Sequence, residues 1–248
     1  MASSVASLHR ARYNLQAQHG YRRMFLTPAE SEALFLSLRI SFVAVFGALP
    51  VAFAAALLLA RTRFPGKTLV DGLIHVPLVL PPVAIGFLLL MALGTRGALG
   101  GWLLHSLGIR FVFSWTGAAL ASAIITFPFQ VRAIRLSLEA IDRGLSQAAQ
   151  TLGAGWWDRL FNVTLPLALP GIAAGVITAF AASLGEFGAI ITFVSNIPGE
   201  TRTLPLAIYT ALQAPGGEEQ AMRLSLLSIL LALIFMTLAE IVQRRARS

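Results

Sequence analysis

The chain contains no cysteine and few charged residues. The absence of cysteine excludes disulfide bonds, thiol catalysis and cysteine-based metal sites within the chain. Its four histidines are scattered without the spacing of a metal site, so we predict no bound metal. Charged residues make up 12% of the 248 positions, against about a quarter in soluble domains, and hydrophobic residues make up 56%. This composition indicates a polytopic membrane protein.

A phosphate-binding loop is also missing. No G-x-x-x-x-G-K-[ST] motif occurs. Gly66-Lys67-Thr68 matches the end of the motif, but Arg61 stands where its first glycine is required. A membrane enzyme would need acid, base, nucleophile or metal-binding groups that converge, and the sequence shows no such cluster. We therefore predict no catalytic residue and no cofactor in this chain.

Long uncharged stretches predict about five membrane-spanning helices. Residues 40–60 hold 21 positions without a charge, close to the roughly 20 needed to cross a bilayer core, and this first span is expected to start near Leu34. Four further spans are predicted at residues 72–95, 111–131, 166–183 and 224–243. The sequence therefore predicts an all-α, polytopic membrane helical bundle.

Two parts of this pattern are irregular. The second span contains Pro77, Pro81 and Pro82, so we expect it to be broken or kinked. Either the broken span faces the bundle interior, where neighbouring helices satisfy its freed carbonyls, or the kink has only a packing role. Residues 96–110, which are rich in glycine, are expected to form an external loop. Between the last two spans, residues 187–199 are too few to cross the membrane and are interpreted as re-entrant or interfacial, followed by a short outer helix at 201–212.

Positive charges indicate which side of the membrane each loop faces. With five spans, ten Lys and Arg lie in segments assigned to the cytoplasm and five in external ones, which places the amino end outside and the carboxyl end inside. The bias disappears when four residues of the amino-terminal tail are counted as external: Arg10, Arg12, Arg22 and Arg23. We therefore expect the functional protein to begin at Met24, with residues 1–23 an extended start or a dispensable tail.

The longest polar passage, residues 145–166, predicts two short helices that meet at a glycine. An apolar stripe at positions i, i+3, i+4 and i+7 consists of Leu145, Ala148, Ala149 and Leu152. Gly153 is expected to end the first helix, and Pro166 suits the first turn of the next element. The stripe is either a docking surface or part of an ordinary cytoplasmic loop.

This passage resembles the EAA loop of ABC importer permeases, whose pattern is EAA, three residues, G, nine residues, I-x-L-P. The matching positions here are Gln147, Ala148, Ala149, Gly153, Val163, Leu165 and Pro166. Gln147 replaces the glutamate of the pattern and removes its charge, whereas valine for isoleucine is a small change. The resemblance implies that the passage is a coupling helix that sits in a groove of a separate ATPase subunit.

Further segments resemble the molybdate permeases of bacterial ABC importers over nearly all of residues 24–243. They are RTRFPGK (61–67), HVPLVLPPVAIGFLLL (75–90), FPFQVRAIRLSLEAID (127–142) and SLGEFGAIITFVSNIPGETRTLPLAIYT (183–210). Sulfate and thiosulfate permeases share the loop and the Gly-Glu-Phe-Gly stretch, but NIPGETRTLP resembles the molybdate branch more. The resemblance implies import of molybdate or tungstate, with sulfate as the alternative.

The resemblance also implies an architecture. We expect the type I ABC importer permease fold, with an amino-terminal tail (1–33), a transmembrane permease domain (34–243) containing the coupling loop (139–166), and a basic cytoplasmic tail (244–248). It implies a homodimer in the bacterial inner membrane that binds an ABC ATPase subunit, which carries ATP and Mg²⁺, and a periplasmic or extracellular molybdate-binding protein. A secondary transporter or channel would also explain the spans, but it would not need the alanine-striped helix pair.

Four polar residues on or just after the fourth span are candidates for the translocation path or gate. Thr178, Ser183 and Thr192 could offer hydroxyls to an oxyanion, although hydroxyls also join helices to one another. A carboxylate would repel an anion, so Glu186 is expected to pair with an arginine or to cap backbone N–H groups at the outer gate.

Overall fold

The computed structural model describes residues 26–247, which form helices without strands. Predictions for residues 1–25, including the start at Met24, lie outside the described residues. The membrane-length helices are α2 (Pro28–Arg61), α6 (Trp115–Ala140), α9 (Leu165–Leu184) and α12 (Glu218–Arg247). The shorter elements are α3 (Lys67–Val79), α4 (Pro82–Leu93), α5 (Ala98–Leu107), α7 (Arg143–Thr151), α8 (Trp156–Arg159), the π-helical turn η1 (Leu160–Thr164), α10 (Gly188–Val194) and α11 (Leu204–Gln213).

The predicted all-α membrane fold is confirmed. Within residues 26–247, four helices are long and apolar enough to cross a membrane, and a fifth span arises if α3 and α4 are taken together. These two helices bend by 112° around the break that Leu80 and Pro81 form. A proline lacks the N–H that would continue the helix, which explains why the predicted break in the second span falls here.

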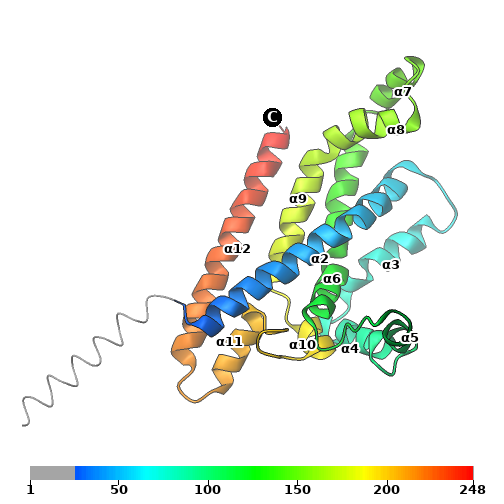
Figure 1. Ribbon diagram of the computed structural model, residues 1–248. Helices are drawn as coiled ribbons and strands as arrows, with labels where there is room; N and C mark the ends of the chain where they lie inside the picture. The colour runs from blue at the N-terminus through cyan, green and yellow to red at the C-terminus, as the bar shows by residue number, and fades with distance from the viewer. Residues whose placement is uncertain (1–25, 248) are drawn as a thin grey trace, which may run out of the picture.

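The centre of the bundle is formed by α2, α6 and α9, with α12 packed against α9 (Figure 1). Small residues let α9 lie close to α6: a Cβ on Gly171 would clash with Ser137, and one on Gly175 would lie 3.2 Å from the Cβ of Ala133. Gln130 of α6 is fully buried and donates to the backbone oxygen of Val45 in α2 at 3.2 Å. Close packing and one buried polar contact therefore fix the three central helices.

Helix α2 begins at Pro28, before the expected start near Leu34. Its first turn is stabilised by a capping box, in which Thr27 accepts from the Glu30 N–H and the Glu30 carboxylate accepts from the Thr27 N–H. The other carboxylate oxygen of Glu30, which is buried, lies 2.8 Å from Nη2 of Arg223 in α12. Residues 28–33 thus form the first turns of α2.

Other differences concern the external elements and the carboxyl end. Residues 98–107 form the helix α5 where a loop was expected, and Gly108 ends it with a φ of 67°. Within residues 187–199, which were interpreted as re-entrant or interfacial, the seven residues of α10 are helical. Helix α12 continues to Arg247, so most of the predicted basic tail is helical.

Helices α4 and α10 pack closely because each contributes a glycine to the contact. A Cβ on Gly86 would lie 2.7 Å from the backbone oxygen of Ala189, and one on Gly188 would lie 3.0 Å from the Cβ of Pro82. A Cβ on Gly86 would overlap backbone atoms, and one on Gly188 would require its neighbours to move by a few tenths of an ångström, so glycine suits both positions. The bent second span is therefore joined firmly to the segment that follows α9.

Candidate functional site

The two short helices α7 and α8 project from one end of the bundle, beyond the ends of α6 and α9 (Figure 1). Helix α7 starts at Asp142, whose carboxylate accepts from the Gly144 N–H at 2.8 Å. In the part of the chain that the structure describes, the elements that α7 packs against are α8 and η1. The surface of α7 that faces away from them is therefore available to another protein.

The predicted apolar stripe lies on this available surface. Leu152 is 88% exposed and Leu145 is 50% exposed, while Ala148 is exposed and Ala149 is half-buried. Gln147 is also exposed. An exposed leucine pair flanking two alanines is unusual for a solvated loop and offers a shallow apolar face to a partner.

The corner between α7 and α8 depends on a left-handed glycine. Gly153 has a φ of 88°, a conformation that side-chain-bearing residues rarely adopt. The Gly153 N–H donates to the backbone oxygen of Gln150 at 3.0 Å, and the Ala154 N–H donates to that of Ala149 at 3.0 Å. A Cβ on Gly153 would meet no atom within 4 Å, so the requirement for glycine comes from the backbone angle and not from crowding.

A side-chain hydrogen bond also joins the two short helices. Nη1 of Arg159 donates to Oε1 of Gln150 at 3.1 Å, across the corner. The buried Nε of Arg159 has no partner within the described residues. Arg159 therefore holds the angle between α7 and α8 and keeps further capacity to donate.

The sequence predicted a second short helix that ends before the fourth span. In the structure it does not end there. Helix α8 continues through the π-helical turn η1 into α9, so residues Trp156–Leu184 form one helical path of 29 residues. Leu165 begins α9 and Pro166 lies in its first turn, where its missing N–H is tolerated. Trp156, Trp157 and Phe161 pack against one another and are all more than half exposed.

The predicted gate residues are distributed over α9, α10 and the connection between them: Thr178 and Ser183 lie on α9, Glu186 between the two helices and Thr192 on α10. Glu186 is buried, and its Oε1 accepts from the Ala189 N–H at 2.9 Å. The carboxylate was expected either to pair with an arginine or to cap backbone N–H groups. In the structure it accepts from a backbone N–H. Burial raises the pKa of the Glu186 carboxyl, whereas backbone hydrogen bonds from Ala189, Phe187 and Gly188 act in the opposite direction.

The three hydroxyls differ in what they can offer. Thr178 donates to the backbone oxygen of Ala174 and Thr192 to that of Gly188, both within their own helices. Ser183 is buried, and its hydroxyl has no partner among the described residues. Ser183 is therefore the candidate whose hydroxyl is not already used in a helix.

A charged cluster that the sequence did not reveal joins α3 to α6. The guanidinium of Arg135 lies 2.8 Å from Asp71 of α3 and 2.8 Å from Glu139 one turn along α6. Nδ1 of His75 lies 3.3 Å from the same Asp71 carboxylate. No side chain of α3 is fully buried, and the cluster adds ion pairs to the apolar contacts that Val70 and Ile74 make with the bundle. Only the i to i+4 spacing of Arg135 and Glu139 could have been seen in the sequence.

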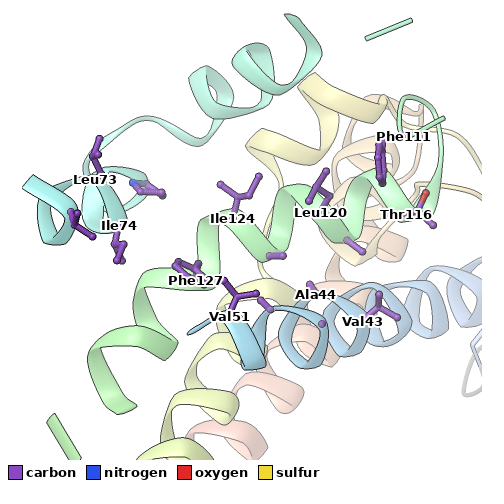
Figure 2. A pocket seen from close by; sticks show the side chains of 16 residues that line it. Val43, Ala44, Val51, Leu73, Ile74, Phe111, Thr116, Leu120, Ile124 and Phe127 are labelled. Carbon is purple, nitrogen blue, oxygen red and sulfur yellow. The ribbon is translucent and has the colours of Figure 1, made fainter. Parts of the chain in front are cut away.

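An apolar cavity with a volume of about 750 Å³ lies between α2, α3 and α6. Figure 2 shows Val43 and Val51 of α2 on one side, Leu73 and Ile74 of α3 on another, and Ile124 of α6 between them. Its lining is almost entirely apolar, and none of the four gate candidates belongs to it. The cavity suits hydrocarbon rather than an oxyanion.

Comparison with known proteins gives this arrangement a family. Residues 33–248 match the model of the binding-protein-dependent transport system inner membrane component. The chain belongs to this family. The molybdenum transport system permease protein ModB of Escherichia coli K12 is 56% identical over 224 residues, which cover 90% of this chain and 98% of the relative. The sulfate transport system permease protein CysT of the same organism is 37% identical, covering 78% of this chain and 69% of its own length.

Solved structures show the same fold. A chain in the crystal structure of a bacterial alginate ABC transporter, in complex with alginate pentasaccharide-bound periplasmic protein, aligns with a TM-score of 0.72. It is 20% identical, and the alignment covers 91% of this chain and 82% of that chain. The predicted type I ABC importer permease fold is confirmed. Because the relatives are permease proteins of transport systems, this family member is a transport subunit and not an enzyme.

Proposed function

We propose that this chain is the transmembrane permease of an ATP-driven importer for molybdate, and that it also admits tungstate. The observation that carries the proposal is the 56% identity to the E. coli molybdenum permease over 98% of that relative. The sulfate permease CysT is 37% identical over 69% of its length, so sulfate remains the second candidate.

The geometry of the gate residues supports an anionic cargo. The Glu186 carboxylate is directed at the backbone N–H of Ala189, which compensates part of its charge. The nearby Ser183 hydroxyl is buried and unused among the described residues, so it could donate to a passing oxyanion. Donors of this kind hold an ion weakly enough for it to leave again, which a permease requires.

The exposed stripe on α7 supports docking of a separate ABC ATPase. We propose that Leu145, Ala148 and Leu152 contact that subunit, which binds ATP and Mg²⁺, and that Gly153 sets the angle at which they are presented. The carboxyl end of α12 lies toward the same end of the bundle as α7 (Figure 1). This agrees with a cytoplasmic carboxyl end and an external amino end.

The proposed assembly is a homodimer of this chain with two ATPase subunits and one molybdate-binding protein on the outer side. Its composition is tested by native mass measurement of the complex purified through a tag on this chain. Two copies of the permease with two ATPase subunits are expected. One permease copy per complex would contradict the homodimer.

Uptake in cells tests the cargo. A strain that lacks this chain should lose molybdenum-dependent enzyme activity, and a high external concentration of molybdate should restore it. Reintroducing the chain should restore uptake of radiolabelled molybdate at low concentration, with competition by tungstate and not by sulfate. If the strain instead requires reduced sulfur while its molybdenum enzymes stay active, the assignment moves to sulfate.

A further inference from the structure

A second cavity lies where the carboxyl end of α2 meets α7 and α8. Its volume is about 400 Å³, and five polar residues line it: Arg61, Thr62, Ser146, Arg159 and Thr164. The remaining wall is apolar and includes Leu57 and Leu58 of α2. The cavity therefore combines two guanidinium groups and three hydroxyls with a hydrocarbon surface.

The side chains of the two arginines pair with no carboxylate among the described residues. Arg61 has no ion pair or hydrogen bond among the described residues. Arg159 bonds only the neutral amide of Gln150, and its buried Nε is unsatisfied in the described part of the structure. No carboxylate lines the cavity, and the adjacent Asp158 is hydrogen-bonded to Asn162. A buried donor without a partner is costly, so the two guanidinium groups favour binding of an anion here.

The position of the cavity favours a lipid as the source of that anion. Arg61 is the last residue of a membrane-spanning helix, and Leu58, one turn before it, lines the cavity and is 45% exposed. Trp156 and Trp157, which are 54% and 65% exposed, lie next to the cavity on α8. Exposed tryptophans of this kind gather at the level of the lipid headgroups. A headgroup phosphate could reach the arginines while its acyl chains stay beside Leu58.

We propose that this cavity binds the phosphate headgroup of an anionic phospholipid from the leaflet at this end of the bundle. The phosphate would accept from Arg61 of α2 and from Nε of Arg159 of α8, with the hydroxyls of Ser146 and Thr164 as further donors. Such a headgroup bridges the first span to the helix pair that carries the exposed stripe. Bound lipid therefore holds α8 against α2. The proposal does not depend on which oxyanion the permease carries.

Lipid binding to the purified full-length chain tests the proposal. The chain is delipidated in detergent and titrated with phosphatidylglycerol or phosphatidylcholine, and bound lipids are counted by native mass spectrometry. Phosphatidylglycerol should occupy one site that phosphatidylcholine does not fill. Arg61→Gln should weaken that binding by about tenfold or more, because it removes a charge-assisted hydrogen bond to phosphate. Arg61→Lys, which keeps the charge, should weaken it less.

The matched control is Arg63→Gln. Arg63 carries the same charge two residues away, but it is exposed and does not line the cavity, so its substitution should change binding less than about twofold. The proposal is overturned if Arg63→Gln weakens binding as much as Arg61→Gln, or if phosphatidylcholine binds equally well. Displacement of the lipid by excess inorganic phosphate or molybdate would assign the site to a soluble oxyanion and also overturn it.

Discussion

Replacing Gly153 with alanine should weaken the association with the ATPase without preventing membrane insertion. The φ of 88° at this corner costs a residue with a Cβ about 1–2 kcal/mol, which corresponds to a roughly 5- to 30-fold smaller population of the observed corner. An affinity that requires this conformation falls by the same factor. The dissociation constant of purified permease variants for the ATPase subunit should therefore rise about 5- to 30-fold. Gly153→Asn should have a smaller effect, because asparagine tolerates left-handed angles better.

Gly155 provides the matched control for this prediction. It lies two residues away, and a Cβ there would also meet no atom within 4 Å, but its φ of −65° and ψ of 172° suit alanine. Gly155→Ala should therefore leave the affinity nearly unchanged. Equal losses for the two alanine variants, or full affinity for Gly153→Ala, would show that the left-handed corner does not set the docking geometry.

Substitutions test two further contacts inside the membrane domain. Arg223→Met leaves the buried Glu30 carboxylate without its 2.8 Å partner and should lower the free energy of unfolding by about 3 kcal/mol, measured by thermal unfolding in detergent. The control is Glu219→Gln, which changes an exposed carboxylate 3.8 Å from the same Arg223. It should change the free energy of unfolding by less than about 0.5 kcal/mol. Equal effects of the two substitutions would refute the role of burial. Glu186→Gln keeps an oxygen for the Ala189 N–H and should retain stability and uptake, whereas Glu186→Ala should lose about 1 kcal/mol of stability. If the glutamine variant is as impaired as the alanine variant, the charge and not the cap is required.

The order of the spans could be predicted because hydrophobic length is a local property of the sequence. The break in the second span was also predictable, since Pro81 and Pro82 lack the N–H groups that a continuous helix needs. The early start of α2 was missed even though Thr27 and Glu30 have the spacing of a capping box, because the charges of Glu30 and Glu32 keep residues 26–33 outside the uncharged run. The glycines of residues 96–110 similarly hid the helix α5.

The candidate site was predictable in part. The stripe from Leu145 to Leu152 follows helical spacing, so its common face could be read from the sequence, and the structure shows that no described part of the chain covers it. The contacts of Thr178 and Thr192 could not be predicted, because a helical hydroxyl can bond its own backbone or face a cavity with the same sequence around it. The pair formed by Glu30 and Arg223 joins residues 193 positions apart, and no local pattern indicates such a contact.

The unbroken helical path from Trp156 to Leu184 has a mechanical consequence. A helix rises about 1.5 Å per residue, so these 29 residues form a rod roughly 43 Å long. Force applied to α8 is therefore transmitted into the membrane through continuous helix and not through a loop. The rod ends at Gly185, next to the Glu186 cap of α10. This rod can bend at the π-helical turn Leu160–Thr164 and at Pro170. A stiffer helix at these places should transmit a movement of α8 more completely to the far end of α9.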